Sequence, residues 1–242
     1  LKELPLTEHE VLSRHALTSG EIADGIRDAV GTDPEVTGAI IDETAPELGN
    51  PEVRLFRRLL SGALDPDKLD YLNRDAYFCG VPYGMQDIDY VLSRLMPLGY
   101  DGIALEAGAV SAVENILFSK YLMYRAVYWH RTVRVATAMV KKGLYLGLKH
   151  DLIKPADLYG LDDESFFGRF ATRPESPFEL VRSVYDRRLH RPAAESPLPE
   201  DSSLLARLSS LDGRLEAERE VAKLIGSSGG ATTDVDVIID IP

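Results

Sequence analysis

Helix start signals and helically spaced apolar residues follow one another through residues 1–95. Asp33, Asn50 and Asp65 each precede a proline, which is the pairing of a side-chain N-cap with proline at the first helical position. The pattern predicts four or five short helices in this part of the chain. Glycines stand where left-handed caps should end these helices, at Gly31, Gly62 and Gly80.

A possible capping box lies at the start of this region, and a long apolar stretch follows the region. Thr7 and Glu10 have the three-residue spacing in which each side chain bonds the other residue's backbone N–H, so the first helix should begin there. Residues 98–105 predict a small turn between short extended pieces. Residues 110–149 carry a wide apolar face and predict one long central helix, with Gly143 as a candidate break.

Prolines are frequent in residues 171–203, which predicts loops in this part of the chain. One short helix should begin there at Ser176, and a linker is expected near 190–203. Residues 203–226 predict a further helix, and residues 234–240 alternate like a strand. The predicted fold class is mainly α, a helical bundle with a small α+β appendage at the C-terminal end.

Composition narrows the functional classes. The 242 residues are 45% hydrophobic, which is enough for a substantial core, and 39 acidic against 27 basic residues leave a net charge of −12. That balance argues against broad nucleic-acid or anionic-lipid binding, so an anionic ligand needs a local basic pocket. Cys79 is the one cysteine, which excludes an intramolecular disulfide and favours a small buried side chain in a reducing compartment. Without an apolar run of ~20 residues or a signal peptide, no membrane partner and a cytoplasmic location are expected.

The densest chemistry lies on the helix predicted to begin after Asp65. Carboxylates, a phenol and cations together can bind a divalent cation and a phosphate, whereas the alternative is a solvated face with weak surface ion pairs. Spacing alone favours the solvated face, because most charged helix faces are simply exposed to water. The side chains on or beside one face of this helix are Asp67, Lys68, Tyr71, Arg74 and Asp75.

A second stripe of aromatic and basic side chains lies on the long helix. Lys120, Tyr124, Tyr128 and Arg131 follow helical spacing and suit a nucleoside phosphate, although a core stripe with outward-reaching heads is the alternative. His9 is a third candidate, since a histidine can act as an acid or base near neutral pH. Sequence motifs of P-loop, dinucleotide-binding, zincin and serine-hydrolase sites are absent from the sequence.

Three segments carry a more specific signal. Residues 65–84 read DPDKLDYLNRDAYFCGVPYG, residues 6–14 read LTEHEVLSR, and residues 119–133 read SKYLMYRAVYWHRTV. Together they resemble signatures of the HD-domain phosphohydrolases, particularly the deoxynucleoside triphosphate triphosphohydrolase branch. The resemblance implies an HD-domain-like helical domain over residues 1–150 and a C-terminal helical and α+β region over residues 151–242.

The resemblance also implies roles for individual residues. Asp67 looks like the last ligand of the family's metal site, and Lys68 and Tyr71 like groups that contact phosphate. Asp75 resembles the carboxylate that meets the sugar hydroxyl. His9 resembles a histidine beside the scissile phosphate, and we expect it to be the catalytic proton donor.

Two residues of the long helix complete this expected site. Lys120 stands where relatives often carry arginine for the phosphate tail, and it keeps the charge without the bidentate fork. Tyr128 resembles the tyrosine against the deoxyribose. The resemblance thus implies a nucleotide substrate, a divalent metal such as Mg²⁺, Mn²⁺ or another transition metal, and a homo-oligomer.

The family's other metal ligands, a histidine and a His-Asp pair, should precede His9. The His-Asp dipeptide of this sequence, His150–Asp151, follows the long helix instead. We expect the missing ligands upstream of Leu1, and their loss is the alternative. Three hypotheses follow: a metal-dependent hydrolase that cleaves dNTPs to deoxynucleoside and triphosphate, an inactive nucleotide-binding or assembly module of the same fold, and a phosphohydrolase of another phosphate ester.

Overall fold

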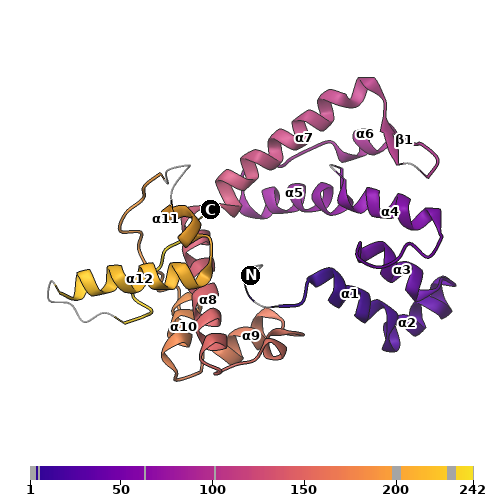
Figure 1. Ribbon diagram of the computed structural model, residues 1–242. Coiled ribbons are helices and arrows are strands. Elements are labelled where there is room, and N and C mark those ends of the chain that lie inside the picture. Colours follow the sequence, from indigo (N-terminus) through magenta and orange to yellow (C-terminus); the bar gives the residue numbers. More distant parts are fainter. Residues whose placement is uncertain are drawn as a thin grey trace. The chain divides into compact units, whose positions relative to one another are not determined.

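The computed structural model describes residues 4, 6–62, 64–100, 102–197, 203–227 and 233–241. Helices dominate these residues, which confirms the mainly α prediction (Figure 1). The chain divides into two compact units, an N-terminal unit of Thr7–Tyr128 and a C-terminal unit of Trp129–Pro242 with Leu1–Leu6. The boundary expected at residue 150 lies within the C-terminal unit. In the described ranges no helix combines the length and the apolarity that crossing a membrane requires.

The N-terminal unit is a succession of short helices with one small hairpin. Two apolar clusters stabilise it, one between α3 and α4 around Val53 and a larger one around Leu72 and Met123 that joins α5, α6 and α7. Its elements are α1 (His9–Thr18), α2 (Gly20–Gly25), the π-helix η1 (Ile26–Val30), α3 (Pro34–Ile41), α4 (Pro51–Ser61), α5 (Pro66–Cys79), α6 (Ile88–Leu92), β1 (Leu95–Pro97), β2 (Ile103–Leu105), the 3₁₀ turn η2 (Ala107–Ala109), α7 (Val110–Met123) and the π-helix η3 (Tyr124–Tyr128).

The three N-cap predictions before proline are confirmed. The side-chain oxygens of Asp33, Asn50 and Asp65 accept hydrogen bonds from the backbone N–H two residues later, at 3.0, 2.9 and 2.8 Å.

Helix α1 begins at His9, so the N-cap position is Glu8 rather than Thr7, and the Glu8 side chain makes no capping hydrogen bond. Gly31 and Gly80 do adopt the left-handed cap conformation. Gly62 does not, since its φ of −73° is extended backbone.

The expected turn near residue 100 is an antiparallel hairpin in which β1 and β2 pair from Leu95↔Leu105 to Pro97↔Ile103. The expected long helix is interrupted after Tyr128, where the π-helical turn η3 ends, and α8 starts afresh with His130 as its N-cap. Gly143 is not the break. It lies within α8, where a Cβ would come 2.8 Å from the carbonyl oxygen of Pro177.

A loop between α5 and α6 approaches α5 very closely. A Cβ on Gly84 would lie 2.6 Å from the Ala76 Cβ and would overlap the Leu72 carbonyl oxygen, so only glycine fits here. Hydrogen bonds also join this loop to α5 and to α7. The Gln86 N–H donates to the Asn73 side chain of α5 at 2.7 Å, and the Gln86 amide donates to the Ser119 hydroxyl of α7 at 2.6 Å.

The C-terminal unit packs its helices around α8. Phe170 and Phe178 stack with ring centroids 5.9 Å apart in one core cluster, and Met139, Leu180 and Leu215 share a second. Its elements are α8 (Arg131–Lys149), the 3₁₀ turns η4 (Pro155–Leu158) and η5 (Ser176–Phe178), α9 (Asp163–Phe170), α10 (Glu179–Tyr185), α11 (Ser203–Leu208) and α12 (Leu211–Gly226).

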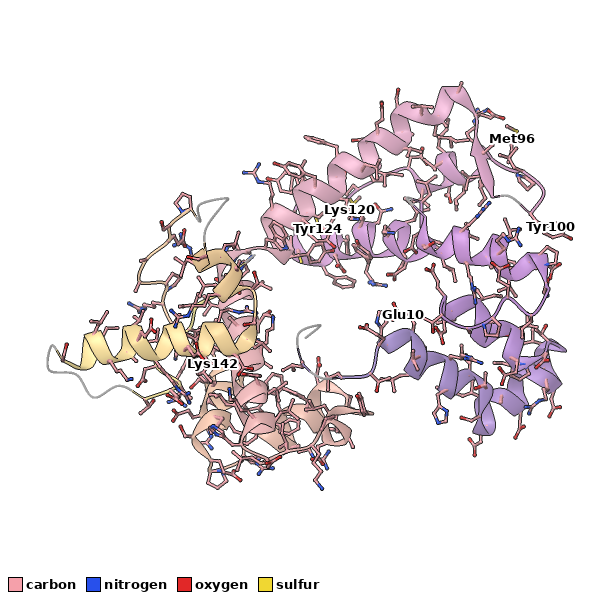
Figure 2. All side chains as sticks on the ribbon, viewed as in Figure 1. Glu10, Met96, Tyr100, Lys120, Tyr124 and Lys142 are labelled. Carbon is pink, nitrogen blue, oxygen red and sulfur yellow. The ribbon has the colours of Figure 1, made fainter. Side chains whose placement is uncertain are left out.

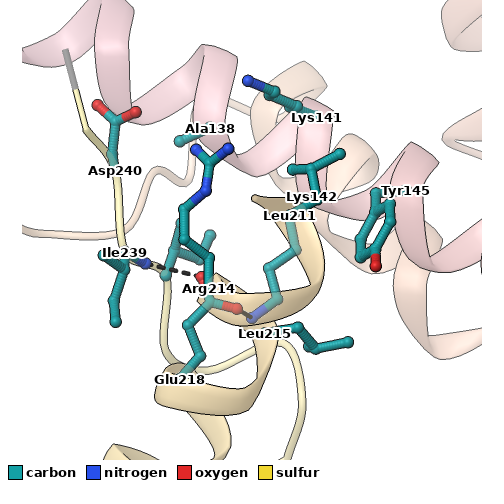
Figure 3. A pocket seen from close by; sticks show the side chains of 11 residues that line it. Ala138, Lys141, Lys142, Tyr145, Leu211, Arg214, Leu215, Glu218, Ile239 and Asp240 are labelled. Atoms are coloured by element: carbon teal, nitrogen blue, oxygen red, sulfur yellow. Dashed lines mark hydrogen bonds and ion pairs between the residues drawn. The ribbon is translucent and has the colours of Figure 1, made fainter. Parts of the chain in front are cut away.

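A buried ion pair secures the end of the chain to this unit. Lys142 and Glu218 are each 6% exposed and lie 2.7 Å apart beside a cavity of about 30 Å³ (Figure 3). Lys142 also donates to the Val237 carbonyl at 2.5 Å, and Glu218 accepts from the Ile239 N–H at 2.8 Å.

These contacts explain why the strand predicted at 234–240 is wrong. The residues form a turn and an irregular extended segment whose backbone groups bond side chains in place of a neighbouring strand. Alternation here reflects packing against α8 and α12, with Val235 buried. The helix expected over 203–226 is split at Ser210, whose hydroxyl caps α12. The short helix at Ser176 is confirmed, and residues 198–202 of the expected linker lie outside the described residues.

We expect the substitution Gly84→Ala to lower the free energy of unfolding by about 1–3 kcal/mol, because the new methyl group forces the loop away from the α5 backbone. Urea unfolding followed by circular dichroism measures this. Gly168→Ala is the matched control. No atom lies within 4 Å of a Cβ there, so alanine should stabilise α9 by about 0.5–1 kcal/mol. Equal effects of the two substitutions would contradict the close approach at Gly84.

Candidate functional site

Helix α5 carries four of the predicted site residues, and α7 with η3 carries two more. The N-cap at Asp65 fixes where α5 begins, and Leu69, Leu72 and Ala76 bury its other side. Asp67 lies exposed in the first turn. Tyr71 and Asp75 follow one and two turns later and are half-buried toward η3.

Three tyrosines from the two segments form a cluster, which we call the tyrosine cluster: Tyr71, Tyr124 and Tyr128. The ring of Tyr128 lies edge-on to both others, with centroids 6.0 Å from Tyr71 and 5.1 Å from Tyr124. Such edge-to-face pairs add about 0.5–1.5 kcal/mol each beyond area burial. The π-helical turn η3 sets the directions of Tyr124 and Tyr128, and turns of this type are frequent at functional sites.

The hydroxyl of Tyr128 donates a hydrogen bond to Asp75 Oδ2 at 2.5 Å. This contact joins residues 53 positions apart that the sequence predicts to face the same sugar. The other Asp75 oxygen lies 3.8 Å from the Arg74 guanidinium, which is mainly paired with Asp70. Asp75 therefore keeps acceptor capacity for a ligand hydroxyl.

The surroundings of the cluster keep the phenol groups of Tyr71 and Tyr128 protonated. Burial, then the neighbouring Tyr124 and the carboxylates of Asp67 and Asp65, raise the pKa of Tyr71 to about 12. Burial and the hydrogen bond to Asp75 raise the pKa of Tyr128 as well. Both phenols are neutral hydrogen-bond donors at physiological pH.

The two predicted lysines are placed differently. Lys120 Nζ lies 5.6 Å from the centroid of the Tyr124 ring, at the cluster, and both residues are labelled in Figure 2. Lys68 is folded back onto the start of α5, donating to the Gly62 carbonyl at 2.9 Å and to Asp65 Oδ2 at 3.1 Å. A phosphate would have to compete with Asp65 for this lysine.

His9 is not brought to the cluster by any described contact. Its side chain is 78% exposed, and its one interaction in the described ranges is with Glu10 Oε2 at 3.0 Å. Arg131 also leaves the predicted stripe. It belongs to the C-terminal unit and pairs with Glu195 at 2.8 Å.

A metal held by Asp67 needs further donor groups close to this carboxylate. In the part of the chain that the structure describes, one set of three carboxylate or imidazole groups lies close enough to share an ion, and it comprises Glu8, His9 and Glu10 at the start of α1. Asp67 is not among them. A divalent metal needs about four to six ligands, so the described residues do not by themselves fit a metal site at Asp67.

Sequence reasoning missed the residues that hold the site together. Asn73, Gln86 and Ser119 link α5, the following loop and α7 through hydrogen bonds of 2.6–3.2 Å. Each is an ordinary polar residue without a spacing signal. The available hint was the pair of glycines in GVPYG, the second of which marks the close approach at Gly84.

Comparison with known proteins identifies a family for this chain. A family model described as "HD associated region" matches residues 88–242, which include Lys120, Tyr124 and Tyr128. The chain belongs to this family. The HD-domain relationship predicted from the sequence motifs is thereby confirmed at that level.

Curated relatives of this HD-associated chain share only part of it. Over 109 residues it is 34% identical to an uncharacterized protein of Methanocaldococcus jannaschii, covering 44% of this chain and 24% of the relative. Over 87 residues it is 40% identical to the uncharacterized protein YwfO of Bacillus subtilis, covering 36% and 20%. The matched stretches span about a quarter or less of these relatives.

Solved structures support the fold. A phosphohydrolase of Bacteroides thetaiotaomicron matches with a TM-score of 0.53 and 19% identity, over 93% of this chain and 67% of that chain. A hypothetical protein of Aquifex aeolicus matches with a TM-score of 0.62 and 24% identity, over 88% and 55%. At these identities the likeness establishes the mainly α architecture of the HD-associated chain.

The raised pKa of Tyr71 predicts alkaline destabilisation. Between pH 10.0 and about 12, the folded chain holds a proton at Tyr71 that the unfolded chain has lost, so the free energy of unfolding falls as pH rises through this window. Tyr71→Phe should remove this contribution and make the fall shallower. Urea unfolding at stepped pH measures it, and the tyrosinate absorbance titration should lose one late-ionising group. An unchanged late fraction would contradict the assignment.

Proposed function

We propose that this chain forms part of an HD-type phosphohydrolase and that the tyrosine cluster with Asp75 forms the sugar-facing wall of its nucleotide site. The substrate proposed is a dNTP, cleaved to deoxynucleoside and triphosphate. The observation that carries the proposal is the hydrogen bond from Tyr128 to Asp75. Two segments that separately resemble substrate-binding signatures meet at that contact.

The chemistry of the cluster supports a nucleoside phosphate. The Tyr128 phenol orients the Asp75 carboxylate, whose remaining oxygen can accept a hydrogen bond from a deoxyribose hydroxyl. Aromatic faces suit a sugar ring, and Lys120 beside Tyr124 supplies a cation for phosphate oxygens. In a chain of net charge −12, such local cations concentrate positive potential where the anionic tail would bind.

Membership in the HD-associated family supports the hydrolase class, and so does the fold shared with the Bacteroides phosphohydrolase. Asp67 is proposed as a metal ligand and His9 as the proton donor. The described donor groups beside Asp67 do not complete a metal site, so we assign no hydrolytic step to this chain by itself.

That same observation favours a second function for the isolated chain, nucleotide binding without hydrolysis. The tyrosine cluster, Asp75 and Lys120 need no metal to contact a sugar and a phosphate. Calorimetric titration with each dNTP, run beside a triphosphate-release assay containing Mn²⁺, separates the two functions. Binding with release supports the hydrolase, and binding without release supports the binding module. Absence of both would overturn the nucleotide assignment.

If Tyr128 and Asp75 contact the sugar, losing this contact should lower the affinity for a dNTP and leave the affinity for inorganic triphosphate unchanged. Tyr128→Phe removes the hydroxyl that orients Asp75 but keeps the ring, so dNTP affinity should fall about tenfold, whereas affinity for inorganic triphosphate should not change. Isothermal titration calorimetry measures both.

Lys120→Ala should weaken both ligands, because each presents phosphate oxygens. Lys154→Ala, an exposed lysine of the C-terminal unit, is the matched control and should weaken neither. If Tyr128→Phe lowered both affinities equally, the site would suit a simpler phosphate ester.

A further inference from the structure

Gln86, in the loop between α5 and α6, is hydrogen-bonded to both of the helices that carry the candidate site. Its backbone N–H donates to Asn73 Oδ1 at 2.7 Å, and its carbonyl oxygen accepts from Asn73 Nδ2 at 3.2 Å, so two bonds hold the loop to α5. Its side-chain amide donates to the Ser119 hydroxyl of α7 at 2.6 Å. A single residue of the loop therefore joins α5 to α7.

The two ends of this bridge lie next to residues of the proposed site. Asn73 stands two residues before Asp75 on α5, and Ser119 stands immediately before Lys120 on α7. A displacement of either helix at the bridge is therefore passed on directly to a residue that is proposed to bind the nucleotide.

The shared core of the two helices sets their relative position less sharply than the bridge does. This core is apolar and includes Leu72, Ala76 and Met123, and apolar contact is non-directional. The bond from Gln86 to Ser119 is directional, and a slide of α7 by about 1.5 Å, the rise of one residue, is enough to misalign it. Because Ser119 is 3% exposed, water has little access to replace the lost partner.

The contact between Tyr128 and Asp75 tolerates little displacement. Their side-chain oxygens lie 2.5 Å apart, at the short end of the range for O–H···O bonds. Tyr128 belongs to η3, which directly follows α7, and Asp75 belongs to α5. A shift of α7 along α5 therefore separates the two groups.

We propose that Gln86 is a positioning residue of the nucleotide site. Through Ser119 it sets the position of α7 relative to α5. This position aligns Lys120 and Tyr128 with Asp75, and Gln86 itself contacts no ligand. The inference rests on the proposed function, because it concerns the alignment of that same site.

The substitution Gln86→Met tests the role of the amide. Methionine is of similar length and leaves both backbone bonds to Asn73 possible, but it has no N–H group for Ser119. The affinity of the 242-residue chain for a dNTP should fall about five- to tenfold, because a nucleotide contacts both helices at once. The affinity for inorganic triphosphate should fall no more than about twofold, because a free ion can follow Lys120. Isothermal titration calorimetry measures both affinities.

Double variants identify the residues through which Gln86 acts. Ser119→Ala removes the other half of the bridge and should cause the same loss of dNTP affinity, with no further loss in Q86M/S119A. Adding Gln86→Met to Tyr128→Phe should also change little, because the contact that Gln86 aligns is already gone. Fold-changes that multiply in either combination would overturn the proposal.

Val53→Ala is the control for a purely structural effect. Val53 is fully buried in the other apolar cluster of the N-terminal unit, between α3 and α4. The truncation should lower the melting temperature at least as much as Gln86→Met does, and it should leave dNTP affinity unchanged. Equal losses of dNTP affinity in the two variants would make general destabilisation the cause and would count against a positioning role.

A titration without nucleotide gives a second readout. In Gln86→Met the tyrosinate absorbance should show one tyrosine that ionises at lower pH than in the wild type, because Tyr128 loses its alignment with Asp75. Val53→Ala should keep the wild-type titration curve. A wild-type curve for Gln86→Met would show that Gln86 does not align this contact.

Two outcomes of the calorimetry tell this inference and the proposed function apart. A wild-type chain that binds no dNTP overturns the proposed function and, with it, the inference. A wild-type chain that binds a dNTP, beside a Gln86→Met variant that binds it equally tightly, overturns the inference alone.

Discussion

The approach of the 81–87 loop to α5 is the constraint on which the N-terminal unit depends. Gly84 lets the loop lie against the α5 backbone, and Gln86 then bridges Asn73 of α5 and Ser119 of α7. Ser119 is 3% exposed, so its hydroxyl would be costly to bury without this partner. The bridge fixes how far α7 can slide along α5. That register brings Tyr128 to Asp75 across 53 positions of sequence.

Burial and polarity cooperate at the resulting site. Desolvation is the main cause that raises the pKa of the Tyr71 and Tyr128 phenols. The second cause is neighbouring charge at Tyr71 and the hydrogen bond to Asp75 at Tyr128. Both phenols therefore stay neutral donors, while Asp75 provides an oriented acceptor. Lys68 is the counterexample. Its charge is already satisfied by Asp65 and a backbone carbonyl, so spacing placed it on the right helix without freeing it for a ligand.

Local chemistry made most of the helical architecture predictable. The Asp33, Asn50 and Asp65 caps act within two residues, so the sequence contains the whole interaction. Predictions failed where distant partners decide the conformation. The alternation at 234–240 predicted a strand. The backbone there is instead hydrogen-bonded by the side chains of Lys142 and Glu218, which lie 76 positions apart on two helices. Gly143 looked like a helix break because sequence alone could not show the Pro177 carbonyl packed against it.

The candidate site follows the same division. The motif resemblance predicts that Asp75 and Tyr128 belong to one site, and the structure joins these two side chains by a hydrogen bond. The roles of His9 and Asp67 remain predictions, because no described contact joins His9 to the cluster and no described group of ligands includes Asp67. Helical spacing also extended the stripe to Arg131, but the break after η3 ends it at Tyr128.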